Sequence, residues 1–418
     1  RQPAADAPGR TPRADRNASG PKTAGQNQPS TTLDAIPAPV DRGELAPVMA
    51  GDGSGLPMEL WSGLDVTGFE KLISEIEIPP RSAALHALWK RLITSNATPP
   101  SGDGAGDKFA ALRLEALYRS GLASEAAAEI AKQQRGANNP VMTLFAARGE
   151  LANAAKDRAC DIGRQASLTK GDIPKPVKIE AMLLNGYCAA VAEDKGGAGL
   201  AAELAREEGA PPSAALDALD AISIGAKPKV AALKHVSLLD YRLLELAGAA
   251  PADALDRMEP ALLAALTNDP HSAAGLRLDA AESAARLNAV SPDGLAAIYA
   301  ALGAAEPADA LLTGSTTSGP ARRAALFKAI EAEKTPMKTT RLVRALIDDA
   351  RRNGLAIQAM QMSARAVARI PAAQELSWFA ETAAEVGLAS ANYDLSTTTF
   401  TNWNFNDSVV VVGSFSNN

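Results

Sequence analysis

The sequence predicts an all-α protein built as an array of antiparallel helical hairpins, an α-solenoid of the tetratricopeptide (TPR-like) type. Three observations favour this fold class. Alanine, the strongest helix former, is the commonest residue in a 418-residue chain that is 46% hydrophobic but only 4% aromatic. Apolar residues recur at spacings of three and four, the period of one helix face. Glycines and prolines interrupt this pattern after about 11 to 17 residues, a length that suits repeat hairpins.

Residues 1–55 are predicted to form a disordered tether. They contain eight prolines and no aromatic residue, because the first aromatic of the chain is Trp61. Six basic side chains balance six acidic ones, so the segment is not a basic arm. Such a composition cannot bury enough apolar surface to offset the entropy lost on ordering. The helical-repeat domain is therefore expected to span 56–390.

The first helices are expected at 66–76 and 81–93. The second should carry a single apolar face made of Leu85, Leu88, Trp89 and Leu92. After a loop rich in Gly, Pro and Asp, two helices at 108–120 and 122–133 are joined at Gly121. A tyrosine before this glycine and an alanine-rich second helix give the hairpin the spacing of a tetratricopeptide unit, without its full consensus.

Similar helices are expected along the rest of the domain. Their approximate ranges are 140–151, 155–167, 176–192, 197–209, 213–223, 237–248, 252–267, 272–288, 292–302, 321–333, 337–352, 356–369 and 372–387. No strict sequence period relates these helices to one another. An irregular helical domain is therefore the competing architecture.

Residues 391–418 are predicted to be a β-prone tail. From Asn392 onward Thr, Phe, Trp and Val replace alanine, and these residue types favour strands. The segments 397–405 and 408–415 could pair as a hairpin. Because a lone hairpin is marginal in water, it would pack on the helices, pair with another chain or begin a further domain.

The sequence offers no motif for catalysis, for a cofactor or for a metal. Its three histidines, His86, His235 and His271, are far apart, and none lies in an HExxH or CxxC context. No GxxxxGK[ST] or GxSxG motif is present. A net charge of -6 argues against nucleic-acid binding, and no apolar run is long enough to span a membrane. We therefore expect a protein that is not an enzyme and needs no cofactor.

The only two cysteines, Cys160 and Cys188, fall on consecutive predicted helices. Antiparallel neighbours could bring the two sulfurs together, which would require α-carbons within about 7 Å. The alternative is a pair of buried free thiols. A disulfide would indicate an oxidising compartment such as a bacterial periplasm.

One predicted helix carries a basic cluster that could receive an acidic partner or a phosphate. Its members are Arg341, Arg344, Arg351 and Arg352. The alternative is a charged outer helix face whose basic groups are offset by nearby Glu331, Glu333, Asp348 and Asp349.

The segments 56–93, 109–127 and 233–248, "LPMELWSGLDVTGFEKLISEIEIPPRSAALHALWKRLI", "FAALRLEALYRSGLASEAA" and "LKHVSLLDYRLLELAG", resemble a group of uncharacterised, exported, alanine-rich helical proteins of alphaproteobacteria. Some of these proteins carry the label "antifreeze glycopeptide polyprotein", which reflects their composition. The resemblance implies an envelope location and a non-enzymatic role, and it transfers no catalytic motif.

Two functional hypotheses are consistent with these observations. The first is a non-enzymatic scaffold of the bacterial cell envelope, periplasmic or exported, that binds other proteins on the long surface of a helical array. The second is a structural subunit of a filament, ring or appendage, whose C-terminal tail adds to a neighbouring subunit and makes a homo-oligomer. Neither hypothesis identifies the partner.

Overall fold

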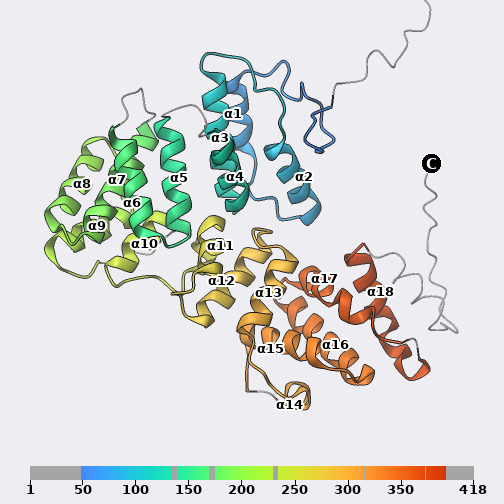
Figure 1. Ribbon diagram of the computed structural model, residues 1–418. Helices are drawn as coiled ribbons and strands as arrows, with labels where there is room; N and C mark the ends of the chain where they lie inside the picture. Colours follow the sequence, from blue (N-terminus) through green and yellow to red (C-terminus); the bar gives the residue numbers. More distant parts are fainter. Residues whose placement is uncertain are drawn as a thin grey trace, which may run out of the picture. The chain divides into compact units, whose positions relative to one another are not determined.

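The computed structural model describes residues 49–133, 139–168, 175–228, 234–314, 316–371 and 373–391. Within these ranges the chain forms α-helices, short 3-10 turns and isolated bridges but no strand, which confirms the predicted all-α class (Figure 1). Most of the predicted tether and, apart from Ala391, the predicted β-prone tail lie outside the described residues. None of the described helices is long and apolar enough to cross a lipid bilayer.

The helices of the first half are α1 (Val66–Glu75), α2 (Ala83–Thr94), α3 (Ala105–Arg119), α4 (Ala123–Gln133), α5 (Pro140–Ala152), α6 (Lys156–Leu168), α7 (Lys175–Val191), α8 (Lys195–Glu207), α9 (Ala214–Ile224) and α10 (Leu238–Leu246). Those of the second half are α11 (Pro260–Asn268), α12 (Ala274–Arg286), α13 (Pro292–Leu302), α14 (Ala308–Thr313), α15 (Gly319–Ala332), α16 (Pro336–Arg352), α17 (Ala356–Val367) and α18 (Ala380–Ala389).

Local sequence signals explain most helix ends. Ser237 and Asp240 form a reciprocal capping box at the start of α10. Prolines occupy the first turn of α5, α11, α13, α15 and α16, where a missing N–H costs nothing. The helix expected at 252–267 is divided for the same reason: a 3-10 turn at Leu255–Arg257 precedes α11, which starts at Pro260. The short helix α14 was not predicted.

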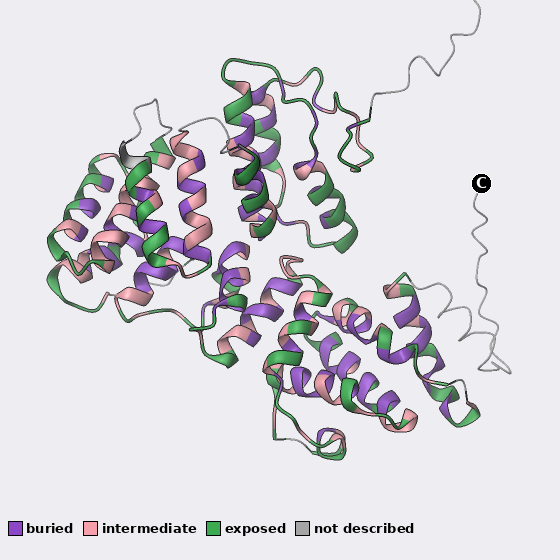
Figure 2. Cartoon of the chain, in the orientation of Figure 1, coloured by how far each residue is buried: buried purple, intermediate pink, exposed green. Residues whose placement is uncertain are grey.

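Buried side chains gather in three clusters along the chain (Figure 2). The first lies mainly under α1 to α5, the second under α5 to α12 and the third under α12 to α18. Helix α12 contributes to two of them, because Ala280 and Ala284 face one cluster while Leu278, Ala281 and Ala285 face the next. Because α5 and α12 each contribute to two clusters, neighbouring clusters share a helix along the chain.

Residues 49–55, expected to be part of the tether, instead belong to the helical domain. The backbone N–H of Ala50 donates to the carbonyl of Leu56 (2.8 Å). Asp52 accepts a hydrogen bond from the backbone N–H of Asn96 (2.5 Å), and Arg91 donates to the carbonyl of Ser54 (2.6 Å). These bonds hold the segment against the end of α2 and the loop after it.

Helix α2 buries only part of the face expected. Trp89 is buried as expected and Leu92 packs against the core, but Leu85 and Leu88 are 58% and 49% exposed. His86 and Ile93 are buried in their place, and the Trp89 indole N–H donates to the Ser120 hydroxyl of the α3–α4 turn (2.8 Å). This buried hydrogen bond is a constraint on the helix that periodicity does not contain.

Cys160 of α6 and Cys188 of α7 form a disulfide, with α-carbons 5.4 Å apart. Of the two alternatives that the sequence left open, the structure shows the bridge. It joins two helices whose connecting residues 169–174 lie outside the described ranges.

The hairpin of α3 and α4 meets a later part of the chain at Gly121. This residue has a φ of +72°, and a Cβ atom there would lie 2.3 Å from the Cβ of Ala289 and 3.1 Å from Pro260. The position therefore requires glycine both for its backbone conformation and for the close approach of Pro260, the first residue of α11, and of the turn after α12.

We expect Gly121→Ala to destabilise the protein by about 3 kcal/mol or more, because it adds a steric clash to the left-handed backbone strain. The matched control is Gly354→Ala. Gly354 has a similar φ of +70° but no atom within 4 Å of an added Cβ, so its cost should be about 1 kcal/mol, the backbone strain alone. Urea unfolding of both variants measures the difference. Equal losses would show that the close approach at Gly121 is not rigid.

We expect the variant Cys160→Ala/Cys188→Ala to lose about 3 to 4 kcal/mol of unfolding free energy, because its unfolded state is no longer closed by a bridge of sequence separation 28. Reduction of the native protein should reproduce this loss and should not further weaken the variant. Titration of the denatured, unreduced protein should detect no free thiol. Two titratable thiols would contradict the pairing.

Candidate functional site

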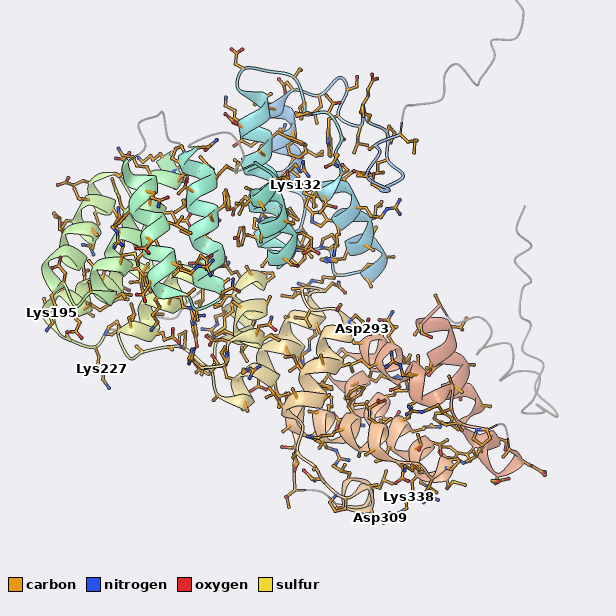
Figure 3. All side chains as sticks on the ribbon, viewed as in Figure 1. Lys132, Lys195, Lys227, Asp293, Asp309 and Lys338 are labelled. Carbon is orange, nitrogen blue, oxygen red and sulfur yellow. A yellow bond between two sulfur atoms is a disulfide. The ribbon has the colours of Figure 1, made fainter. Side chains whose placement is uncertain are left out.

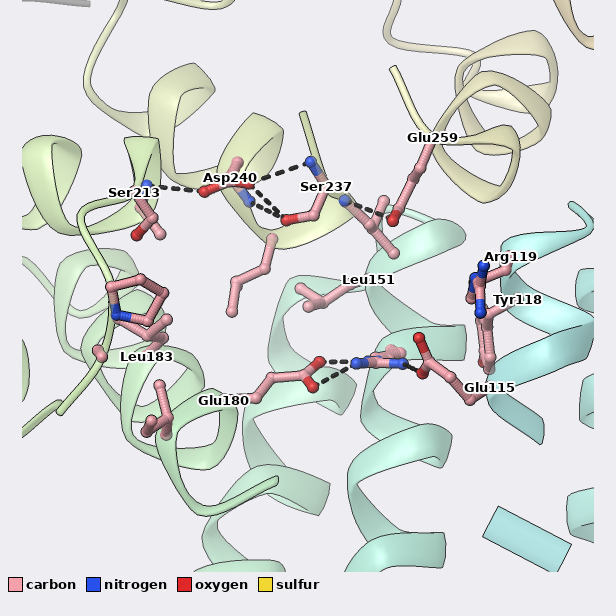
Figure 4. A pocket seen from close by; sticks show the side chains of 17 residues that line it. Glu115, Tyr118, Arg119, Leu151, Glu180, Leu183, Ser213, Ser237, Asp240 and Glu259 are labelled. Atoms are coloured by element: carbon pink, nitrogen blue, oxygen red, sulfur yellow. Dashed lines mark hydrogen bonds and ion pairs between the residues drawn. The ribbon is translucent and has the colours of Figure 1, made fainter. Parts of the chain in front are cut away.

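A cavity of about 270 Å³ lies between α3, α5, α7 and α10 (Figure 4). We call it the Glu259 cavity. Its apolar wall consists of Leu151, Ile179, Leu183, Pro211, Leu238 and Leu239. Its charged groups are Glu115, Arg119, Arg148, Glu180, Asp240 and Glu259. The cavity thus combines an apolar surface with several carboxylates that come from separate helices.

Arg148 of α5 is the central cation of this site. Its Nε and Nη2 donate to the two carboxylate oxygens of Glu180 on α7, and its Nη1 donates to Glu115 on α3 (2.8 Å). Figure 4 shows the carboxylates of Glu180 and Glu115 on opposite sides of the guanidinium that they share. The guanidinium also lies 4.8 Å from the ring centroid of Phe145. Burial acts to lower the pKa of Arg148, but pairing with Glu180 and Glu115 outweighs this effect and raises the pKa. The side chain therefore stays charged.

Tyr118 supports Arg148 from α3. Its hydroxyl donates to the backbone carbonyl of Phe145 (2.9 Å), and the two rings stack with centroids 5.6 Å apart. Burial raises the pKa of Tyr118 well above its usual range. The Tyr118 side chain therefore stays uncharged at neutral pH, and it links α3 to α5 rather than acting as an acid or a base.

Asp240 forms hydrogen bonds that join two helices on the opposite side of the cavity. One carboxylate oxygen accepts from the backbone N–H of Ala215 (2.8 Å), and the other accepts from the N–H (3.1 Å) and the hydroxyl (2.7 Å) of Ser237. These bonds join the first turns of α9 and α10. Asp240 has a structural role and little capacity left for a ligand.

Glu259 is the one carboxylate of this cavity that makes no ion pair and no side-chain hydrogen bond among the described residues. It precedes α11, and one of its oxygens accepts from the backbone N–H of Leu238 (2.7 Å). The other oxygen makes no hydrogen bond or ion pair with any described residue. Burial raises the pKa of Glu259 to about 7, and Glu115 and Glu180 add to the rise, while the Leu238 N–H and Arg148 oppose it. Near neutral pH this group is therefore poised between its neutral and charged forms.

The cavity carries an excess of negative charge once Glu259 ionises. Four carboxylates line it, against the guanidinium groups of Arg148 and Arg119. Arg119 is half-buried on α3, and it forms no hydrogen bond or ion pair within the described part of the chain. A ligand with a cationic group on an apolar stem would therefore fit this cavity. Its stem would contact the apolar wall, and its cation would meet the negative charge and the free oxygen of Glu259.

A pKa near 7 would also suit a general acid, and a cavity lined by carboxylates is the feature that would favour an enzyme. Acid–base chemistry on a substrate usually needs a second group that is free to act. Here Glu115 and Glu180 are held by Arg148, and Asp240 is held by Ser237 and Ala215.

The basic cluster expected on α16 is largely paired. Arg344 lies 3.7 Å from Asp348, Arg351 lies 3.0 Å from Glu385 of α18, and Arg352 lies 3.6 Å from Asp349. Only Arg341 of the four has no ion pair among the described residues. On the same helix Lys338 pairs with Asp309 of α14 (2.8 Å; Figure 3). The alternative of a charged outer face describes this helix better than a free basic surface does.

The histidines are not brought together either. His86 is buried under α2, and no group of three or more His, Cys, Asp or Glu side chains suited to a metal ion occurs among the described residues. Sequence reasoning missed Arg148, Glu180 and Glu259 because they lie on or next to three different helices and form no local motif. The one local signal was Glu259 itself, an acidic residue directly before the proline that starts a helix.

Comparison with protein-family models, with curated proteins and with solved structures finds no match for the chain.

We expect Glu259→Gln to change the pH dependence of stability. Because the folded pKa is about 7, above the ordinary value of 4.5, Glu259 favours folding below that ordinary value, and the benefit is lost as pH rises towards 7. The variant has no such loss, so relative to wild type it should gain about 3 kcal/mol between pH 4.5 and pH 8. Denaturant unfolding across this range measures the gain. A constant difference between the two proteins would contradict the raised pKa, and Glu207→Gln, at an exposed position on α8, serves as the surface control.

Proposed function

We propose that this protein is a non-enzymatic helical scaffold of the bacterial envelope that binds another protein, and that the Glu259 cavity receives a lysine side chain of this partner. The observation that carries the proposal is Glu259, the one carboxylate of the cavity that makes neither an ion pair nor a side-chain hydrogen bond with a described residue. A half-buried carboxylate with an unbonded oxygen gains from a cation that arrives with its own apolar stem.

The size of the cavity supports a single side chain as its occupant. Its volume of about 270 Å³ is below the usual 300 to 1,000 Å³ of sites for drug-sized ligands. Lysine suits it better than arginine, because Glu259 offers one oxygen to a compact ammonium and not the two that a planar guanidinium would use. Arg119 is free to donate to a backbone carbonyl or carboxylate of the same partner.

The envelope location is supported by the disulfide of Cys160 and Cys188, because such bridges persist in oxidising compartments. Helices that pack consecutively in chain order suit a scaffold, since each helix adds surface without a separate domain. The alternative of a structural subunit rests on the C-terminal tail, which lies outside the described residues, and no observation on the helices favours it.

We expect Nα-acetyl-lysine methylamide to perturb the NMR signals of residues around the cavity, and the matched norleucine compound, which lacks the ammonium, to bind more weakly. The affinity for the lysine compound should rise between about pH 6 and 8, because Glu259 ionises in this range and an ammonium stabilises its charged form. Glu259→Gln should weaken binding about tenfold and remove this pH dependence.

Glu333→Gln, at a residue that does not line the cavity, is the control and should bind as wild type does. Equal binding of the lysine and norleucine compounds, or an unchanged pH profile in Glu259→Gln, would refute the proposed role of the cavity.

A further inference from the structure

A smaller cavity, of about 170 Å³, is lined by residues of α2, α3 and α4. We call it the Arg113 cavity. Its lining consists of Lys90, Thr94, Arg113, Leu117, Glu125, Ala128, Glu129 and Lys132. None of these residues lines the Glu259 cavity, so a ligand in the Arg113 cavity does not depend on the proposed function.

Arg113 of α3 is the buried cation of this lining, with only 7% of its surface exposed. Its Nε donates to the carbonyl of Ile93 in the last turn of α2 (2.8 Å). Its Nη1 lies 3.7 Å from Glu129, a distance that allows an ion pair but is too long for a hydrogen bond. Its Nη2 is buried and has no hydrogen-bond partner among the described residues. A guanidinium nitrogen without an acceptor is costly in a protein interior.

The other two buried arginines among the described residues are better compensated. Arg242 and Arg323 each contact two carboxylates at 3.0 Å or less, and although burial acts to lower the pKa of each, these contacts raise it. For Arg113 burial is the stronger effect: it lowers the pKa, and Glu129 opposes it only in part. The folded chain therefore compensates the charge of Arg113 less completely than it compensates the other two.

The carboxylates of the lining are already paired with lysines. Lys90 of α2 pairs with Glu125, and Lys132 of α4 pairs with Glu129 (3.4 Å). Lys132, which is labelled in Figure 3, is exposed, and so is Lys90. The lining contains three cations and two carboxylates, so its net charge is +1. It therefore lacks one negative charge, and the buried cation is the one without a close partner.

The charge of the lining favours a monoanion over a phosphate dianion. A dianion would reverse the net charge and would bring two negative charges close to Glu125 and Glu129. A carboxylate carries one charge on two oxygens in one plane, which suits the fork of a guanidinium. Leu117 and Ala128 add apolar surface for the carbon to which the carboxylate is attached.

We propose that the Arg113 cavity binds a carboxylate, the group shared by an acidic side chain of a partner protein and a small carboxylic acid. One of its oxygens accepts from Nη2 of Arg113, and the exposed ammonium groups of Lys90 and Lys132 neutralise its outer side. The ligand supplies the acceptor that the folded chain does not provide, and it joins α2 and α4 through their shared neighbour α3.

Titration with sodium acetate tests this assignment, with chloride exchanged for acetate so that ionic strength stays constant. In protein labelled with ¹⁵N-arginine, the Nε–H signal of Arg113 should shift and reach saturation. The melting temperature should rise with acetate concentration, because the ligand binds only the folded state. Phosphate should bind more weakly than acetate. Nα-acetyl-glutamic acid α-methylamide distinguishes the sources: binding tighter than that of acetate indicates an acidic side chain, and weaker binding indicates a small acid.

Lys132→Gln removes a cation at an exposed position, so it should weaken acetate binding about threefold without unfolding the protein. Lys178→Gln is the matched control. Lys178 is also exposed and pairs with a carboxylate, that of Glu208, but it does not line the cavity, so this variant should bind acetate as wild type does.

Arg113→Gln should weaken acetate binding about tenfold or more, because it removes the buried charged donor. It also loses the bond to Ile93, so its melting temperature without acetate should fall. The proposal is overturned if chloride alone shifts the Arg113 signal and stabilises wild type as acetate does, if phosphate binds more tightly than acetate, or if Lys132→Gln binds acetate like wild type.

Discussion

Buried arginines need compensating carboxylates, and this constraint ties the helices of the chain together. Arg148 joins α5 to α3 and α7, and Arg242 joins α10 to the end of α5 and to Asp269, directly after α11. Arg323 of α15 pairs with Glu282 of α12 and Asp349 of α16. Removing one member of such a buried pair leaves an uncompensated charge, which costs more than the intact pair contributes. The positions of these helices are thus mutually dependent.

The alanine-rich composition explains why long charged side chains join the helices to one another. Alanines such as Ala126, Ala147 and Ala202 are fully buried and let neighbouring helices approach closely, but each removes little apolar surface from water. Much of the rest of the core is leucine and other large apolar side chains, but their contacts are not directional, so specificity between helices must come partly from elsewhere. Directional contacts of arginine with carboxylates and carbonyls supply it.

The two cavities occur where this compensation is incomplete. Around Arg323 every donor finds an acceptor: both oxygens of Glu282 and one of Asp349 are used, and the Tyr299 hydroxyl also donates to Glu282. That network is structural. By contrast, Glu259 retains an unused acceptor and Arg113 retains an unused donor, each beside a cavity. Nη2 of Arg113 is buried, where a donor without an acceptor is costly, whereas Glu259 is half-buried and has one oxygen left for a ligand.

The sequence by itself determined the all-α class and the approximate extent of nearly every helix after Pro140, because helical period, caps, glycines and prolines act over a few residues. Only the tertiary structure decided that Cys160 and Cys188 pair, that α2 buries His86 and leaves Leu85 exposed, and that Arg148 meets carboxylates of two other helices. These outcomes depend on contacts between residues distant along the chain, and local periodicity does not encode which of several arginines and carboxylates will meet. The candidate sites arise from such contacts, so they could not be found by reading the sequence for motifs.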